Sequence, residues 1–176
     1  MKKVRGFEVV RGKEEDGINL PKRQTKNSAG YDFEAAEDTF IPSIWKLMAK
    51  RLIAKVSPFI PAAVEFSYDG DAVKPTLVRT GVKAYMQEDE ALYLYNRSSN
   101  PIKRFLLLSN GVGVIDSDYY NNPDNDGEIM FQFINFGLNP VTIKKGERIG
   151  QGVFKKFLKA DNDKASGERK GGHGST

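Results

Sequence analysis

The chain of 176 residues contains no cysteine and one histidine, His173, which is the fourth residue from its end. Without cysteine it can form no disulfide framework, no thiolate nucleophile and no cysteine zinc site. Because the body of the chain lacks histidine, a Ser-His-Asp triad and a two-histidine metal site are also excluded. Any enzymatic chemistry must therefore depend on carboxylates, hydroxyls, amides, arginines and backbone N–H groups.

Long apolar runs and a strong charge imbalance are missing as well. No stretch approaches the roughly 18 uninterrupted apolar residues of a transmembrane helix, and residues 1–10 lack the apolar segment of a secretory signal. The 27 basic residues exceed the 23 acidic ones by four, and segment 44–56 alone contributes four basic residues and no acidic one. We therefore expect a cytoplasmic protein without a membrane partner or a specific nucleic-acid partner.

Short apolar or alternating runs recur along the chain, rich in Val, Ile, Phe and Tyr and separated by Asn, Asp, Gly and Pro. The expected strands are 4–10, 31–36, 76–85, 91–95, 104–108, 112–115, 129–135, 141–144 and 149–157. Many short strands at this spacing predict an antiparallel sandwich, jelly roll or barrel. The length and the 39% hydrophobic content suit one domain with a core of ordinary size.

Two segments depart from the strand pattern. Residues 43–57 place apolar side chains at helical spacing between Pro42 and Pro58, which predicts an inserted helix. Packing of its apolar face on the sheet or on a neighbouring subunit is favoured over a role at a membrane surface or on nucleic acid. Residues 159–176 are polar and glycine-rich, which predicts a flexible tail until a ligand orders it.

The strongest chemical motif covers residues 109–119, in which apolar residues alternate with glycine and a carboxylate follows. Glycines in a hairpin let a planar ligand approach the backbone. Asn110 offers both a donor and an acceptor to the edge of a base, and Asp116 can act as a general base toward water. Tyr119 can stack on a sugar or a base. An ordinary glycine-rich turn is the competing interpretation.

Three further segments are suited to phosphate. Residues 97–99, Arg-Ser-Ser, follow an apolar run and supply an arginine and hydroxyls, and residues 146–151 add an arginine and an amide. In residues 169–176, glycines let successive N–H groups converge on an anion, although the segment does not match a Walker A loop. Taken singly, Arg-Ser-Ser is a weak signal that surface turns often produce, and an ordinary turn is the better interpretation of 146–151. A disordered tail is the competing interpretation of 169–176.

In order along the chain, these segments resemble the five motifs of the homotrimeric dUTPases, a family common in phages and bacteria. The matching segments are 28–33 (Ser-Ala-Gly-Tyr-Asp-Phe), 97–99, 110–119, 146–151 and 169–176. The resemblance implies an all-β jelly-roll or distorted β-barrel domain over residues 1–158, with one short α-helix inserted at about 43–57. It also implies a homotrimer whose sites draw residues from three subunits, and a flexible tail, 159–176, that closes over the active site.

By this resemblance the substrate is dUTP and the products are dUMP and pyrophosphate, so the enzyme would control the dUTP level and supply dUMP for thymidylate synthesis. Asp116 would be the catalytic residue, activating the water that attacks the α-phosphorus. Mg²⁺ is the implied cofactor, held by the three phosphates and by water with no direct protein ligand. Positioning and charge neutralisation are what such phosphoryl chemistry mainly needs.

The resemblance also implies the residues that bind the substrate. They are Arg97, Ser98, Ser99, Asn110, Gly113, Ile115, Tyr119, Gln151, Arg169, Gly172, His173, Gly174, Ser175 and Thr176. Asn110 and the backbone of its hairpin would read uracil, Tyr119 would pack under the deoxyribose, and the tail would close over the γ-phosphate. Asp32 and Arg148 would support the site from outside the substrate.

The tail departs from the family pattern at one position. His173 stands where the fifth motif usually has a phenylalanine that stacks over uracil. Either the imidazole stacks there or another aromatic side chain covers the base, and Phe131, on the strand after the hairpin, is the candidate. The connection that contains the inserted helix, and the hairpin at 120–126, are also longer than is usual in the family.

Three alternatives stay open beside dUTP hydrolysis. One is a phage-type effector that binds a regulatory protein through the inserted helix or the long hairpin. Another is the related dCTP deaminase, which shares the fold and an Arg-Ser-Ser motif; Gln132 stands on the strand where its glutamate would be needed, which disfavours deamination. The third, a capsid-like jelly roll, would not need the five motifs.

Overall fold

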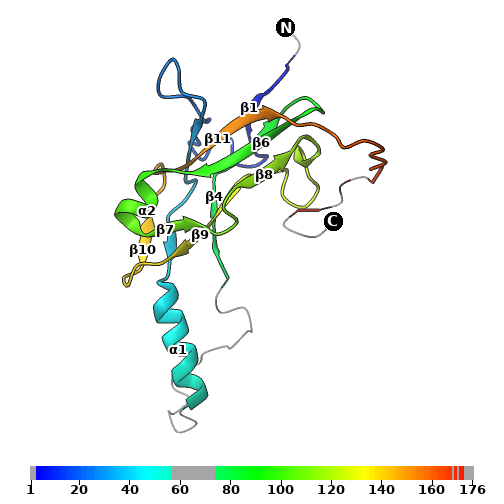
Figure 1. Cartoon of the computed structure of the whole chain (residues 1–176). Helices are drawn as coiled ribbons and strands as arrows, with labels where there is room; N and C mark the ends of the chain where they lie inside the picture. The colour runs from blue at the N-terminus through cyan, green and yellow to red at the C-terminus, as the bar shows by residue number, and fades with distance from the viewer. Residues whose placement is uncertain (1–2, 57–73, 168, 170, 173–176) are drawn as a thin grey trace.

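Short strands make up most of the regular structure (Figure 1). The computed structural model describes residues 3–56, 74–167, 169 and 171–172, with only the backbone for helix residues 51–56. Within these residues the strands are β1 (Gly6–Val9), β2 (Tyr31–Glu34), β3 (Thr39–Ile41), β4 (Thr76–Arg79), β5 (Val82–Tyr85), β6 (Glu90–Asn96), β7 (Leu106–Leu108), β8 (Gly113–Asp116), β9 (Met130–Asn135), β10 (Val141–Ile143) and β11 (Arg148–Lys156). The helices are α1 (Ile44–Val56) and α2 (Ser99–Arg104), and a single 3₁₀ turn, η1, covers Ser117–Tyr119.

The strands form two larger sheets and two pairs. The larger sheets have the orders β2-β11-β6-β8 and β4-β9-β7, and the pairs are β1-β5 and β10-β3. Every one of these pairings is antiparallel. The predicted all-β class with an inserted helix is therefore confirmed, in a jelly-roll-like arrangement of short strands.

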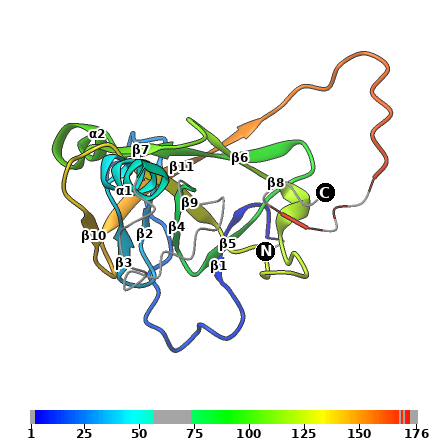
Figure 2. The ribbon, with the colours of Figure 1, turned by 90° about the horizontal axis from the view of Figure 1, so that it is seen from below.

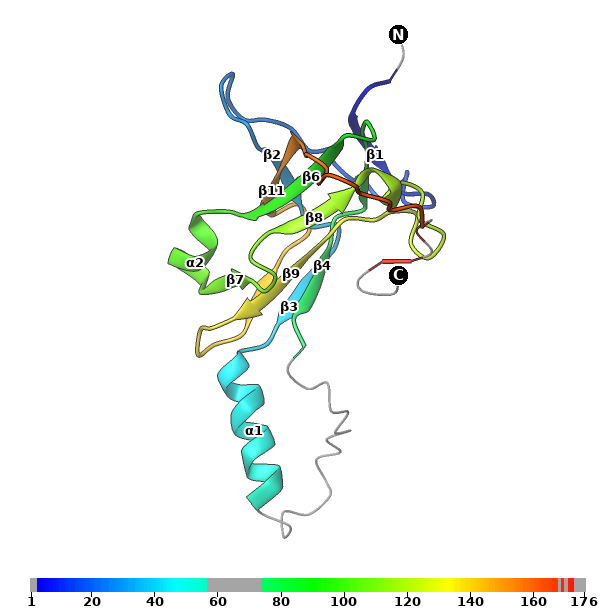
Figure 3. The same cartoon turned by 45° about the vertical axis from the view of Figure 1, so that its right-hand side comes forward.

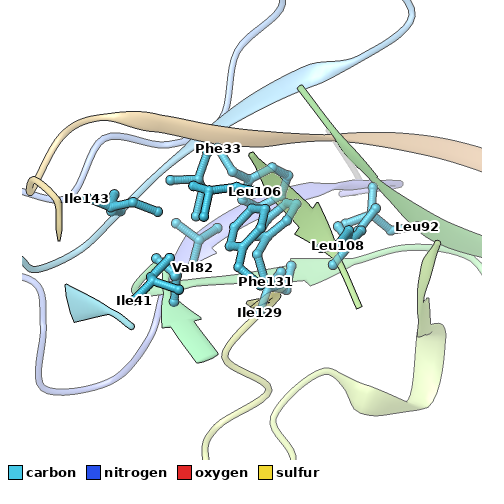
Figure 4. Close-up of a cluster of buried hydrophobic side chains, with 14 of the residues drawn as sticks. Phe33, Ile41, Val82, Leu92, Leu106, Leu108, Ile129, Phe131 and Ile143 are labelled. Carbon is cyan, nitrogen blue, oxygen red and sulfur yellow. The ribbon is translucent and has the colours of Figure 1, made fainter. Parts of the chain in front are cut away.

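Side chains from both sheets and both pairs meet in one apolar core (Figure 4). Strand β9 shows how the sequence builds it, because its residues alternate between the two faces of the sheet. Phe131 and Phe133 point into the core and are fully buried, and the ring of Phe131 lies 5.6 Å from that of Phe33. Each large side chain buried in this way contributes about 1.5–3 kcal/mol to folding.

The expected strand at 76–85 is two strands. Thr80 and Gly81 separate β4, which pairs with β9, from β5, which pairs with β1. The Thr80 hydroxyl donates to the Ile129 carbonyl at 2.7 Å and is buried. The chain thus passes from one sheet to another at this point, and an unbroken apolar run does not reveal such a change of partner.

Helix α1 begins after Pro42, as predicted, and projects away from the strands (Figures 1 and 3). The Trp45 indole donates to the Phe136 carbonyl at 2.9 Å, and Ile44 and Leu47 line a small hollow against β9. Met48, one turn further on, is about half exposed. The contacts of Ile44, Trp45 and Leu47 thus hold the first turn of the helix against β9 and the residue that follows it. In the described part of the chain, no helix combines the length and apolar character needed to cross a membrane.

Candidate active site

The four-stranded sheet positions the first four motif segments, three of them on its strands and the second directly after the end of β6. Strand β11 lies between β2 and β6, so Gln151 is opposite Asp32 on one side and Tyr95 on the other. Strand β8 pairs with the far edge of β6 and places Asp116 opposite Ala91. Segments that are far apart in the sequence are thus brought onto one sheet by strand pairing.

One group of polar side chains gathers where β6 ends and β11 begins. The Arg148 guanidinium donates to the Asp32 carboxylate at 3.1 Å, and the Arg97 guanidinium donates to the Arg148 carbonyl at 3.1 Å. Gln151, three residues after Arg148 on β11, is half-buried, and Ser98 is exposed. We call Asp32, Arg97, Ser98, Arg148 and Gln151 the clamp cluster. Its arginines and hydroxyl are suited to phosphate oxygens.

Helix α2 supports this cluster, and the sequence did not predict it. Ser99 is its first residue, and Pro101 is tolerated there because the first turn of a helix leaves its N–H groups unpaired. The Asn100 side chain is buried and donates to Asn96 Oδ1 and to the Ile149 carbonyl, both at 2.8 Å. Asn100 therefore ties the Arg97–Ser99 segment to β11. Its position directly after the second motif was the only signal that could have identified it.

A second group of side chains surrounds a cleft of about 170 Å³ beside β8. Asn110, Ile115, Asp116 and Tyr119 line it, together with Gly113. Asn110 is exposed near the tip of the hairpin, and the Asp116 side chain is half exposed. The structure thus brings together the expected base-reading, sugar-packing and catalytic residues of the third motif.

The expectation that Phe131 covers the base is wrong. Its side chain is fully buried in the core, because odd-numbered residues of β9 point inward. The neighbouring Met130 and Gln132, which point the other way, line the cleft. Gln132, the residue that disfavours deamination in the sequence, is thus one of the residues that line the cleft. Strand alternation in the sequence could have identified Met130 and Gln132 in place of Phe131.

Tyr119 lies in η1, directly beneath the cleft, and is almost fully buried. The Asn125 amide donates to its hydroxyl at 2.7 Å, which fixes the ring from the long hairpin. An aromatic ring held in this way offers a rigid surface for an apolar sugar face. The longer hairpin therefore supports the site.

The tail leaves the end of β11 and returns toward β8 (Figure 2). The Arg169 Nε donates to Asp118 Oδ1 at 2.7 Å, and its Nη2 donates to Asp116 Oδ2. These contacts, led by the hydrogen bond to Asp118, raise the pKa of Arg169. Gly172 also lines the cleft. The expected contacts of His173, Gly174, Ser175 and Thr176 lie outside the described residues.

A buried ionic network lies under the long hairpin. The Lys83 ammonium donates to Asn121 Oδ1 at 2.6 Å and to Asp126 Oδ2 at 2.7 Å, and the Arg11 side chain also pairs with Asp126. Burial alone would raise the pKa of Asp126, but the hydrogen bonds from Lys83 and Arg11 outweigh it and lower that pKa to about 2. The network ties the hairpin to β5 and to the segment after β1, and no pattern in the sequence indicates it.

The two groups of site residues lie apart within one chain. Asp116 is opposite Ala91 at the start of β6, whereas Arg97 follows Asn96 at its end. The five residue steps of extended strand from Ala91 to Asn96 separate them by about 17 Å. In the described part of the chain, no three or more Asp, Glu or His side chains are placed to hold a metal ion.

Comparison with known proteins gives the same assignment over most of the chain. The dUTPase family model matches residues 67–176. The deoxyuridine 5'-triphosphate nucleotidohydrolase of Lactococcus lactis subsp. lactis (strain IL1403) is 48% identical over 176 residues, covering 99% of this chain and 98% of the relative. The enzyme of the same name from Fusobacterium nucleatum is 29% identical over 157 residues, covering 89% of this chain and 82% of the relative.

Solved structures agree with the sequence relatives. The dUTPase of Streptococcus mutans has a TM-score of 0.68 and 42% identity, covering 89% of this chain and 99% of that one. A mutant dUTPase from phage phi11 of S. aureus, described with a structural Mg(II) ion, has a TM-score of 0.62 at 14% identity, covers 94% of this chain and 98% of that one, and supports the fold alone. Since the family model covers more than half of the chain and the Lactococcus relative matches nearly all of it, the chain belongs to the dUTPase family.

Proposed function

We propose that this chain hydrolyses dUTP to dUMP and pyrophosphate, and that Asp116 activates the attacking water. Family membership supports the reaction, and relatives that match nearly the whole chain are named for it. The observation that carries the assignment of Asp116 is its place at the end of β8, half exposed in the cleft between Asn110 and Tyr119. A cytoplasmic location fits a nucleotide substrate.

Asp116 is suited to the role of general base. Of its two carboxylate oxygens, Oδ2 accepts a hydrogen bond from Arg169, and no described residue is seen to donate to Oδ1. An open carboxylate oxygen facing a cleft can accept a proton from water. Water activated there would attack the α-phosphorus, and the bond to the β-phosphate would break with release of pyrophosphate.

The hairpin and Tyr119 would select the nucleotide. The Asn110 amide can donate to and accept from the edge of uracil, and Gly113 and Ile115 border the same cleft. Tyr119 is buried under the cleft, where it would pack against deoxyribose and leave no room for a ribose 2′-hydroxyl. A tight fit around the base would likewise exclude the methyl group of thymine.

The phosphates would be held by a second copy of the chain. The clamp cluster is about 17 Å from Asp116 within one chain, which is too far for one nucleotide to be bound by both. A homotrimer in which the cleft of one copy faces the clamp cluster of another would complete each site. The tail residues 172–176 would then close over the γ-phosphate.

Mg²⁺ would enter the site with the triphosphate. The described residues offer no cluster of three acidic side chains, and Asp116 is already paired with Arg169. That donor set fits an ion held chiefly by phosphate oxygens and water, as is usual for Mg²⁺ with nucleotides. Bound in this way, Mg²⁺ would neutralise phosphate charge.

The test is pyrophosphate release from dUTP, dCTP, dTTP and UTP, each with Mg²⁺. We expect turnover of dUTP and rates at least about 100-fold lower for the other three. Asp116→Asn should lower the dUTP rate about 1,000-fold, the usual contribution of a general base, while Asp124→Asn, an exposed acid on the same hairpin, should not. Turnover of dTTP at the rate of dUTP would refute uracil selection, and an active Asp116→Asn variant would remove Asp116 from its role.

A second function, binding of a regulatory protein, is favoured by one observation. Helix α1 projects from the strands (Figure 3), and Trp45 and Met48 on it are about half exposed. A helix that hydrolysis does not use is available to a partner. Replacing residues 44–73 by a short Gly-Ser linker should leave dUTP hydrolysis unchanged, and loss of hydrolysis would assign the helix to the enzyme instead.

A further inference from the structure

Asp118 is an acidic residue at the cleft that the proposed reaction does not use. It lies in η1, two residues after Asp116, and its side chain is 56% exposed. Arg169, which pairs with both carboxylates, is only 20% exposed. Among the described residues, Arg169 is the one cationic side chain seen to contact either of them. The tail arginine is thus the more enclosed member of the group.

The two carboxylates contact different edges of the guanidinium. Asp118 accepts from Nε at 2.7 Å, and Asp116 accepts from Nη2. Because the guanidinium is a planar fork with five N–H groups, one edge can keep its partner while the other exchanges. A triphosphate entering the cleft competes for the Nη groups, since arginine binds phosphate oxygens strongly.

We propose that Asp118 is a positioning residue for the tail. It holds Arg169 beside the cleft through Nε, so that the Nη edge can pass from Asp116 to the triphosphate without loss of the tail from the site. This exchange frees Asp116 for the water at the moment when substrate is bound. The inference rests on the proposed function of Asp116.

Tyr119 provides the surface on which the tail is held. The Arg169 guanidinium carbon lies 5.8 Å from the centre of the Tyr119 ring, within the range of a cation–π contact. Gly172 lies so close to the same ring that a Cβ there would be 2.8 Å from Cε2. The tail therefore contacts the ring at two points, and Asp118 fixes the first of them from the side. Tyr119 is also the proposed sugar platform, so the position of Arg169 is set relative to the nucleotide.

The experiment compares Asp118→Asn, Arg169→Gln and the double variant. Each single change should lower kcat/KM for dUTP by about three- to tenfold, as for a half-exposed charged hydrogen bond. The double variant should be no slower than Arg169→Gln, because both changes remove the same contact. Asp118→Glu should retain most of the wild-type kcat/KM, because it keeps a carboxylate. Asp124→Asn, which changes a matched exposed acid, should retain all of it.

A second measurement does not depend on activity. Hydrogen exchange of the amides in 165–172, measured without nucleotide, should be faster in Asp118→Asn and Arg169→Gln than in the wild type and unchanged in Asp124→Asn. The proposal would be overturned if Asp118→Asn had the same kcat/KM and the same hydrogen-exchange rates as the wild type. It would also be overturned if the two single losses in kcat/KM multiplied in the double variant. If the wild type does not hydrolyse dUTP, the proposed function fails, and the exchange measurement alone decides on Asp118.

Discussion

At the scale of single residues, charged side chains lie in two layers around the cleft. Asp116 and Asp118 are half exposed and share Arg169, which suits groups that must exchange partners with a substrate. Below them, Lys83 and Glu128 are almost fully buried and are paired with charges of opposite sign. Buried charges persist only when they are paired, so this lower layer is structural.

The lower layer predicts a pH dependence of stability. The pKa of Asp126 is about 2 in the folded chain against 3.8 ordinarily, so its contribution is complete above about pH 4 and is lost as the pH falls through 2. Asp126→Asn should reduce the free energy of unfolding at pH 7 by about 2 kcal/mol, measured by urea denaturation. The deficit should shrink by pH 3.

The control for this prediction is Asp124→Asn, on the same hairpin but exposed. Its stability should match that of the wild type at both pH values, because surface substitutions away from a network usually change stability by less than about 0.5 kcal/mol. An Asp126→Asn deficit that is the same at pH 7 and pH 3 would contradict the role of the ionised carboxylate.

At the scale of elements, β11 is the strand on which the site depends. It pairs with β2 and β6 and brings Arg148 and Gln151 to the clamp cluster. The register of its pairing with β2 is irregular between Arg148 and Gly150, where the strand crosses the core. A Cβ on Gly150 would lie 2.0 Å from Cε1 of Phe131. The backbone of β11 therefore rests directly on the core aromatic ring, and only glycine fits there.

Gly150→Ala should accordingly destabilise the chain by about 1–3 kcal/mol, the usual cost of overpacking a core. Thermal unfolding of the variant measures it. Gly167→Ala is the matched control, since no atom lies within 4 Å of a Cβ at that position. Equal melting temperatures for the two variants would show that the core yields to the added methyl group.

The elements also show what sequence patterns can predict. Alternation and turn residues located most strands, and proline bounded helix α1. They did not reveal the break between β4 and β5, because a change of partner strand leaves no mark in an apolar run. Helix α2 was missed since its Pro101 reads as a turn, and Phe131 was assigned to the wrong face although the alternation of β9 was visible.

At the scale of the whole molecule, the chain carries its site residues in two separate groups, at opposite ends of β6. The motifs in the sequence were enough to predict the family, which the comparisons confirm, and the roles of the individual residues stay predictions. Their separation by about 17 Å could not be predicted, since it depends on the register of β6 with β8 and β11. The contacts of Arg169 with Asp116 and Asp118 likewise depend on the path of the tail back to β8. The spacing of motifs along the sequence does not determine that path.

Subunit mixing tests most directly whether Asp116 of one copy works with the clamp cluster of another. Asp116→Asn and Arg97→Ala should each be nearly inactive in dUTP hydrolysis. Co-expressed in equal amounts, they should recover about a quarter of the wild-type rate, because half of the copies keep Asp116 and half of those meet an intact Arg97. Mixed trimers no more active than the two variants measured separately would contradict the account.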